Sequence, residues 1–152
     1  MDQLIATTKI LIKDNWIRAL IGGFVGTVVF TLMGMFLAPQ VIGQPMDVGV
    51  LLAPIFGGSH TAGSIAHFVM GSVLFPVAYL AIGIRFLPGP GWLRGAIFLI
   101  PLYLGAMVVI MPLLGHGFFF DSPPKAMVAL MSHIAFGVFM GAIIGRPTGS
   151  DK

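Results

Sequence analysis

Cysteine is absent from this 152-residue chain, which excludes disulfide bonds, iron–sulfur clusters and thiolate metal sites. Charge is scarce as well, because only 9% of the residues are charged whereas 57% are hydrophobic. A soluble domain of this length needs a far more polar surface. The composition therefore indicates an integral membrane protein with room for one domain.

Long uncharged runs account for this apolar composition. Each can supply the roughly 20 apolar residues that cross a hydrocarbon layer about 30 Å thick. Membrane β-strands are shorter and alternate in polarity, so these runs favour helices. We expect an all-α integral membrane protein, in which residues 1–152 form a single four-helix transmembrane domain. The expected membrane-spanning helices lie near residues 17–38, 63–84, 95–114 and 126–145.

The basic residues predict how these helices are oriented. Four crossings place both termini and the loop between the second and third helices on one side, and the opposite side has Lys125 as its one basic residue. The positive-inside rule then predicts an inner (cytoplasmic) membrane protein with both termini cytoplasmic, and the short loops predict an up-down-up-down bundle. The charges are divided among three segments, so nucleic acid is not an expected partner. The basic residues of the predicted cytoplasmic side are Lys9, Lys13, Arg18, Arg85, Arg94, Arg146 and Lys152.

Three segments lie outside these helices. Residues 1–15 mix apolar residues with lysines, which suits either a short helix on the membrane surface or the start of the first crossing. Residues 39–59 include GVLLAPIFGG, which can skim the membrane surface or re-enter it. Residues 115–125, GHGFFFDSPPK, form a tight aromatic loop on the same predicted side.

Two short motifs occur in both halves of the chain. A Trp-x-Arg motif begins at Trp16 and again at Trp92, and a His-x-x-x-Gly motif begins at His67 and again at His133. Each motif falls at an equivalent place in its half. The pattern predicts two parallel helical-hairpin repeats, about residues 16–84 and 92–145, related by an axis along the membrane normal.

The paired histidines raise the main functional question. Both are expected at a similar depth in the outer half of the membrane, on helices that lie diagonally across the bundle at a distance of roughly 13 Å. That distance suits two imidazoles that bind one iron from opposite faces through bonds of about 2 Å. Gly71 and Gly137 would leave space beside them for a flat macrocycle. We therefore predict a b-type haem held by His67 and His133, with Gly71 and Gly137 next to it.

Other interpretations of these residues stay open. The glycines also suit close helix packing, and a neutral histidine can be satisfied by a backbone carbonyl or a hydroxyl group. A Cu(I) site is a further alternative, because methionine and imidazole are suitable ligands and four methionines fall in the outer halves of the first and third helices. These are Met33, Met35, Met107 and Met111. His60 and His116 are expected to be solvated residues of the outer surface, without a ligand.

The sequence does not predict an enzyme. No expected crossing has an acidic or basic residue at its centre, and no phosphate loop or nucleophile with a matching base occurs. The prolines Pro39, Pro76, Pro101 and Pro112 are expected to kink or end helices. We expect no catalytic residues.

A set of short motifs resembles a family of small bacterial four-helix membrane proteins of unknown function. They are a glycine-rich first helix, Pro45-Met46-Asp47 in the outer loop, and the two His-x-x-x-Gly motifs. The resemblance covers about residues 22–145 and implies the architecture but no activity.

From this we expect a small subunit of a larger bacterial membrane complex, in a respiratory or electron-transfer setting. Its expected partners are other membrane-protein subunits and the lipid bilayer, including bound lipid. The alternatives are a cofactor-free accessory or assembly subunit and a metal-handling or transport protein.

Overall fold

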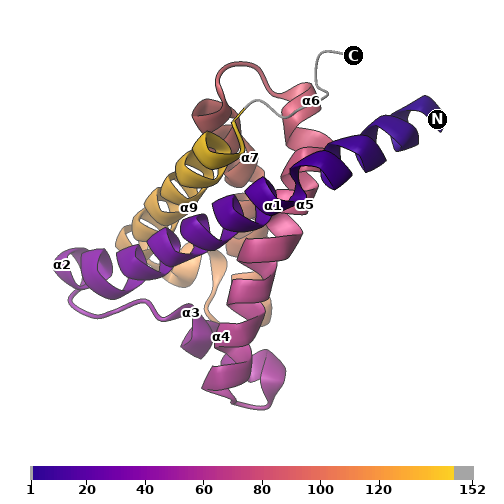
Figure 1. The fold of residues 1–152 in the computed structure, drawn as a ribbon. Coiled ribbons are helices and arrows are strands. Elements are labelled where there is room, and N and C mark those ends of the chain that lie inside the picture. The colour runs from indigo at the N-terminus through magenta and orange to yellow at the C-terminus, as the bar shows by residue number, and fades with distance from the viewer. Residues whose placement is uncertain (1, 146–152) are drawn as a thin grey trace.

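Four helices are long and apolar enough to span a membrane, and they make up most of the chain (Figure 1). The computed structural model describes residues 2–145, apart from the side chains of residues 2–5, 7, 9 and 11. The four helices, called spans 1 to 4 below, are Ile12–Ile42, His60–Phe86, Gly91–Leu113 and Pro123–Ile144. No strand occurs between residues 2 and 145. The expectation of an all-helical chain with four such helices is confirmed.

Each span except the last consists of several helical segments. Span 1 is made of α1 (Asp2–Leu32) from Ile12 onward, η1 (Met33–Leu37) and α2 (Ala38–Ile42). Span 2 is made of α4 (His60–Val69), η3 (Met70–Leu74), α5 (Phe75–Ala78), η4 (Tyr79–Gly83) and α6 (Ile84–Phe86). Span 3 is made of α7 (Gly91–Gly105), η5 (Ala106–Ile110) and α8 (Met111–Leu113), and span 4 is α9 (Pro123–Ile144). The loops contain α3 (Val48–Leu52), η2 (Ala53–Phe56) and η6 (Phe118–Asp121).

The N-terminal segment is helical and continuous with span 1, because α1 runs without a break from Asp2 to Leu32 and the span begins at Ile12. Both arrangements predicted for residues 1–15, a helix on the membrane surface and the start of the first crossing, stay predictions. Among the seven basic residues assigned to the cytoplasmic side, the side chain of Lys9 and residues 146 and 152 lie outside the described part of the chain.

Prolines explain most of the irregular turns within the spans. The π-helical segments η1, η3 and η5 are each followed directly by a short α-helix with proline at its first or second position, namely Pro39, Pro76 or Pro112. Proline has no amide hydrogen, and its ring collides with the carbonyl group four residues earlier. The preceding turn therefore widens to hold one more residue. The helices continue through these prolines, and Pro101 lies inside α7.

Glycines bring spans 3 and 4 into direct backbone contact. A Cβ atom on Gly95 would collide with the carbonyl oxygen of Gly137, and one on Gly137 would collide with that of Gly95. Gly91 and Gly141 meet in the same way one turn away. Small residues let membrane helices approach this closely. The packing of α7 on α9 is the most extensive contact in the bundle.

Span 1 lies between spans 4 and 2, again through glycines. On one side, Cβ positions of Gly22 and Gly26 lie 3.0 Å from the carbonyl oxygens of Met140 and Phe136 in α9. On the other side, the Cβ position of Gly23 lies 2.9 Å from the Ser72 carbonyl oxygen in span 2. Three of the four neighbouring pairs of spans therefore pack through glycine.

Spans 2 and 3 form the fourth pair, and they meet mainly at one end. The Tyr79 and Phe98 rings lie 5.4 Å apart, and the Tyr79 hydroxyl donates to the Gly91 carbonyl oxygen at 3.3 Å. Within the described chain, η4 with α7 is the main contact between elements of these two spans. We call this the basic end, since Arg85 and Arg94 lie there, and the opposite end, with α3 and η6, the loop end. The spans diverge toward the loop end.

We expect Gly95→Ala to lower the stability of the protein by about 1–3 kcal/mol, because a methyl group there forces α7 and α9 apart. Gly105→Ala is the matched control, since the Cβ position of Gly105 has no neighbour within 4 Å. Alanine favours helix over glycine, so the control should leave stability unchanged or raise it by up to about 1 kcal/mol. Thermal unfolding in detergent measures both, and equal effects would contradict the backbone contact.

Candidate functional site

An apolar cavity of about 540 Å³ lies where spans 2 and 3 diverge. All four spans contribute to its wall, together with the two loops of the loop end, which contain α3 and η6. The wide turns η1, η3 and η5 line it through Gly34, Met70 and Met107, among others. Its volume falls in the range of pockets that hold cofactors and other small molecules. The polar residues of the wall are His67, Ser132 and His133.

His67 on α4 and His133 on α9 lie close together in this cavity. The Phe30 ring of span 1 contacts both imidazoles, with ring centroids 5.4 Å from His67 and 4.9 Å from His133. The two imidazole centroids can therefore be no farther apart than the sum of these distances. Two residues that are 66 positions apart in the chain thus share one site.

His133 is held by the backbone of its own helix. Its Nδ1 lies 2.7 Å from the carbonyl oxygen of Ala129. A carbonyl oxygen can only accept a hydrogen bond, so Nδ1 carries the hydrogen and Nε2 has the lone pair. Because its hydroxyl donates to the Val128 carbonyl oxygen at 2.9 Å, Ser132 has already used its one hydrogen. The remaining hydrogen-bonding capacity of this part of the wall is for accepting, at Nε2 of His133 and at the Ser132 oxygen.

His67 is held by span 1. Its Nε2 lies 3.2 Å from the Thr31 hydroxyl, and that hydroxyl lies 2.9 Å from the Thr27 carbonyl oxygen. The one hydroxyl hydrogen goes to the carbonyl, so Thr31 accepts from Nε2 of His67, and Nδ1 has the lone pair. Each imidazole is therefore anchored through one nitrogen and offers the other as an acceptor. Such a pair suits a metal ion or a ligand with O–H groups.

The two predicted glycines are used mainly for helix packing. Gly71 lines the cavity, but its Cβ position is directed at the Thr27 side chain of span 1. Gly137 is packed against Gly95 and is not part of the cavity wall. The predicted place of Gly71 beside a macrocycle stays a prediction. The same prediction for Gly137 has no support from its position in the structure.

The methionines divide into two groups. Met107 and Met111 line the cavity, together with Met46 from the loop, and pack against Tyr103 and Ala129. Met33 and Met35, the other two methionines considered for copper, lie outside the wall. Among the described residues, no group of three or more histidine, cysteine or acidic side chains could hold a metal ion.

A loop segment covers the cavity at the loop end. The short helices α3 and η2 pack on α4, and Leu51, Leu52 and Phe56 from them line the cavity. Residues 39–59 had been considered as a segment that skims or re-enters the membrane. In the structure the middle of this loop forms a helical cover.

Sequence reasoning missed the interaction that holds this cover. Asp47 caps α3, with Oδ1 accepting from the backbone amides of Gly49 at 2.8 Å and Val50 at 3.4 Å. Its Oδ2 lies 2.9 Å from Nε2 of His60, the first residue of α4. An aspartate before an apolar helical segment is a recognisable cap. The pairing with His60 required the fold of the intervening loop.

His116 and His60 do not reach the cavity wall. His116 lies against the Phe120 ring with centroids 6.1 Å apart, and its Nε2 is buried without a hydrogen-bond partner in the described structure. His60, expected as a solvated residue, is exposed but bound to Asp47.

Comparison with known protein families identifies a match. A model of a family of unknown function, DUF6789, matches residues 13–152. No curated protein matches the chain, and no solved structure does.

The Asp47 cap should make the loop cover sensitive to acid. Burial raises the pKa of Asp47, but hydrogen bonds from His60, Gly49 and Val50 and the charge of His60 lower it, so the net pKa lies below the ordinary 3.8. A lowered folded-state pKa stabilises the protein above the unfolded pKa, and this is lost as pH falls through the folded value, below 3.8. We expect protection of residues 48–56 from hydrogen exchange to fall in that range.

The variant Asp47→Ala tests the cause of this protection. Loss of the cap should reduce protection of residues 48–56 at pH 6 by an amount that corresponds to about 1 kcal/mol. Asp14→Ala, on the exposed surface of α1, is the control and should leave these residues unchanged. Mass spectrometry of exchanged peptides measures both, and full protection in Asp47→Ala would refute the role of the cap.

Proposed function

The chain belongs to DUF6789, a family of unknown function. We propose that it is a small non-catalytic subunit of a bacterial membrane complex that transfers electrons. In this proposal, His67 and His133 hold a b-type haem in the cavity between spans 2 and 3. One observation carries the proposal: both imidazoles lie in one apolar cavity, and each presents an unpaired nitrogen.

The environment of His133 fits a metal ligand well. Histidines that bind metals usually donate their second ring nitrogen to a carbonyl or carboxylate, which fixes the tautomer and the ring orientation. The bond from Nδ1 to the Ala129 carbonyl oxygen does this. A bound haem would supply one-electron transfer, and the apolar wall would keep water from it.

The environments of Phe30 and His67 set conditions on this proposal. Phe30 contacts both imidazoles, so its ring must turn away before both can bind one iron. The His67 ring must also leave Thr31 if it binds through Nε2, or bind through Nδ1 where it stands. The hydrogen bond that would break in the first case is 3.2 Å long, at the weak end of the usual range.

The orientation and the repeat belong to the same proposal. Arg18, Arg85 and Arg94 support a cytoplasmic basic end and cytoplasmic termini, with an up-down-up-down path of the four spans in the inner membrane. The repeated Trp-x-Arg and His-x-x-x-Gly motifs support two parallel hairpins, residues 16–84 and 92–145. On this view the cavity lies near the outer face. The described loops are too short to form a separate binding domain, so we propose that other membrane subunits are its partners.

A second candidate is a cofactor-free accessory subunit that stabilises a membrane complex. The contacts of Phe30 with both imidazoles favour it, because together with Thr31 and Ala129 they satisfy the histidines as a packed structural pair. The two candidates predict different spectra and different effects of Phe30.

We expect the complex purified from native membranes to show a sharp α-band typical of b-type cytochromes after reduction with dithionite. His67→Ala and His133→Ala should each abolish the band, because each removes one axial ligand. His116→Ala is the control, since His116 lies outside the cavity wall and takes no part in the Asp47 pair that holds the cover, and it should retain the band. A spectrum without the band in the native complex would reject the haem and leave the accessory role.

Phe30→Ala separates the two candidates further. With haem bound, the band should persist at full intensity, because the substitution removes a ring that must otherwise turn away. In the cofactor-free protein, loss of this contact should lower stability by about 3 kcal/mol, as for other large-to-small changes at packed sites. The visible spectrum and thermal unfolding of the variant, measured side by side, show which role Phe30 has.

A further inference from the structure

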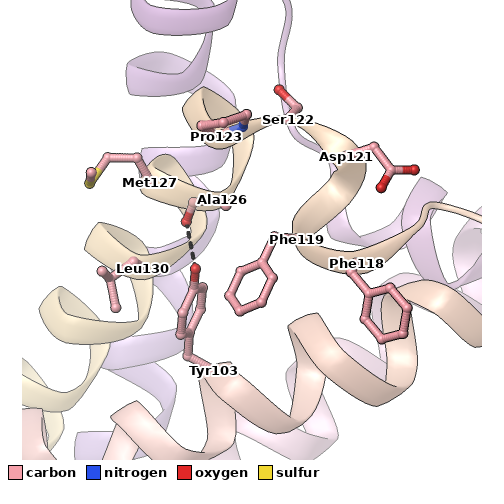
Figure 2. Close-up of a pocket in the computed structure, with 9 residues that line it drawn as sticks. All are labelled: Tyr103, Phe118, Phe119, Asp121, Ser122, Pro123, Ala126, Met127 and Leu130. Carbon is pink, nitrogen blue, oxygen red and sulfur yellow. Dashed lines mark hydrogen bonds between the residues drawn. The ribbon is translucent and has the colours of Figure 1, made fainter.

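A second cavity, of about 470 Å³, opens at the surface near the loop end of spans 3 and 4 (Figure 2). None of its lining residues belongs to the wall of the histidine cavity. The residues that line the second cavity are Tyr103, Phe118, Phe119, Asp121, Ser122, Pro123, Ala126, Met127 and Leu130. Three aromatic rings and one carboxylate thus meet at an open site that the proposed function does not use.

The turn that builds this site has an unusual backbone. Phe119, Phe120 and Asp121 have φ values of 51°, 62° and 47°, in the left-handed region that residues other than glycine adopt rarely. This path sends Phe120 into the histidine cavity, while its two neighbours line the second cavity. Backbone strain of this kind persists where the surrounding structure requires it, and is common at binding sites.

The aromatic rings offer their faces rather than a hydroxyl group. The Tyr103 hydroxyl donates to the Ala126 carbonyl oxygen at 3.2 Å, as the dashed line in Figure 2 shows. The Phe119 ring lies beside Tyr103, with centroids 6.1 Å apart. Phe118 is 61% exposed and Phe119 is 37% exposed. Aromatic faces carry partial negative charge and attract cations.

Asp121 adds a full negative charge to this site. Asp121 is exposed and lines the cavity, so its carboxylate can reach a ligand there. In Figure 2 its carboxylate and the Phe118 ring project to the same side of the turn. The carboxylate lies against Gly117, where a Cβ atom would collide with its oxygens. A carboxylate and an aromatic face that line one cavity favour an ammonium group over an anion or a neutral group.

The rest of the cavity is apolar and continues along the membrane-spanning helix. Met127, which is 56% exposed, and Leu130 extend the wall along α9. A ligand that fits has a positively charged head and an apolar chain. Lys125 lies in the first turn of α9, four positions after Asp121. Its positive charge suits a phosphate group next to the ammonium group.

We propose that this cavity binds an aminophospholipid through its ethanolamine head group. Asp121 and Phe118 hold the ammonium group, and Phe119, Met127 and Leu130 contact the first part of an acyl chain. The site would fix one lipid at the loop end, independently of whether the histidine cavity holds haem.

Native mass spectrometry of the full-length protein in detergent tests this, with phosphatidylethanolamine and phosphatidylglycerol of identical chains as probes. We expect the wild type to bind phosphatidylethanolamine in preference to phosphatidylglycerol. Asp121→Asn and Phe118→Leu should each weaken phosphatidylethanolamine binding about fivefold and leave phosphatidylglycerol binding unchanged. Asparagine tolerates left-handed backbone well, so Asp121→Asn should preserve the turn.

Phe86→Leu is the matched control, because Phe86 is 71% exposed and lies at the basic end. It should bind both lipids as the wild type does. Equal binding of phosphatidylethanolamine by the wild type and Asp121→Asn would overturn the proposal. So would a matching loss in Phe86→Leu, or binding of a soluble alkyltrimethylammonium ion without binding of the lipid.

Discussion

The backbone contact between α7 and α9 is the constraint on which the rest of this bundle depends. Within a membrane the hydrophobic effect does not drive helices together, so close packing and the absence of side chains at the contact must do so. Gly95 and Gly137 bring the two backbones together, and Gly22, Gly23 and Gly26 join span 1 to its neighbours. Spans 1 and 2, 1 and 4, and 3 and 4 are thereby packed closely together. Spans 2 and 3 are in contact mainly at the basic end.

The cavity follows from this unequal packing. Spans 2 and 3 are joined near Tyr79 and Phe98, and their contact weakens toward the loop end. Widened turns ahead of Pro39, Pro76 and Pro112 contribute to the wall. The basic end therefore forms a tightly packed scaffold, and the loop end holds two cavities separated by the Phe120 turn. A buried histidine in such surroundings needs a partner for its N–H group, and each of the two has one.

The candidate site was predictable in its residues but not in its contacts. The recurrence of His-x-x-x-Gly identified His67 and His133, and equal depth followed from counting residues along two helices. The same reasoning assigned Gly137 to the cofactor, although it packs against Gly95. The sequence did not predict the contacts of Phe30 and Thr31 with the histidines, or the pairing of Asp47 with His60. Each of these contacts depends on a segment that is distant in the chain.

The amino-acid sequence by itself determined that the chain is helical, that four stretches can span a membrane, and where each begins and ends within a few residues. These properties are local, since length and hydropathy decide whether a stretch can satisfy its backbone within lipid. Only the tertiary structure decided which face of each helix meets which neighbour. Helices that are apolar all round, such as α9, carry no periodic pattern that reports their rotation. The rotation is set by close contacts between residues far apart in the chain, and it decides that His133 faces a cavity while Gly137 faces another helix.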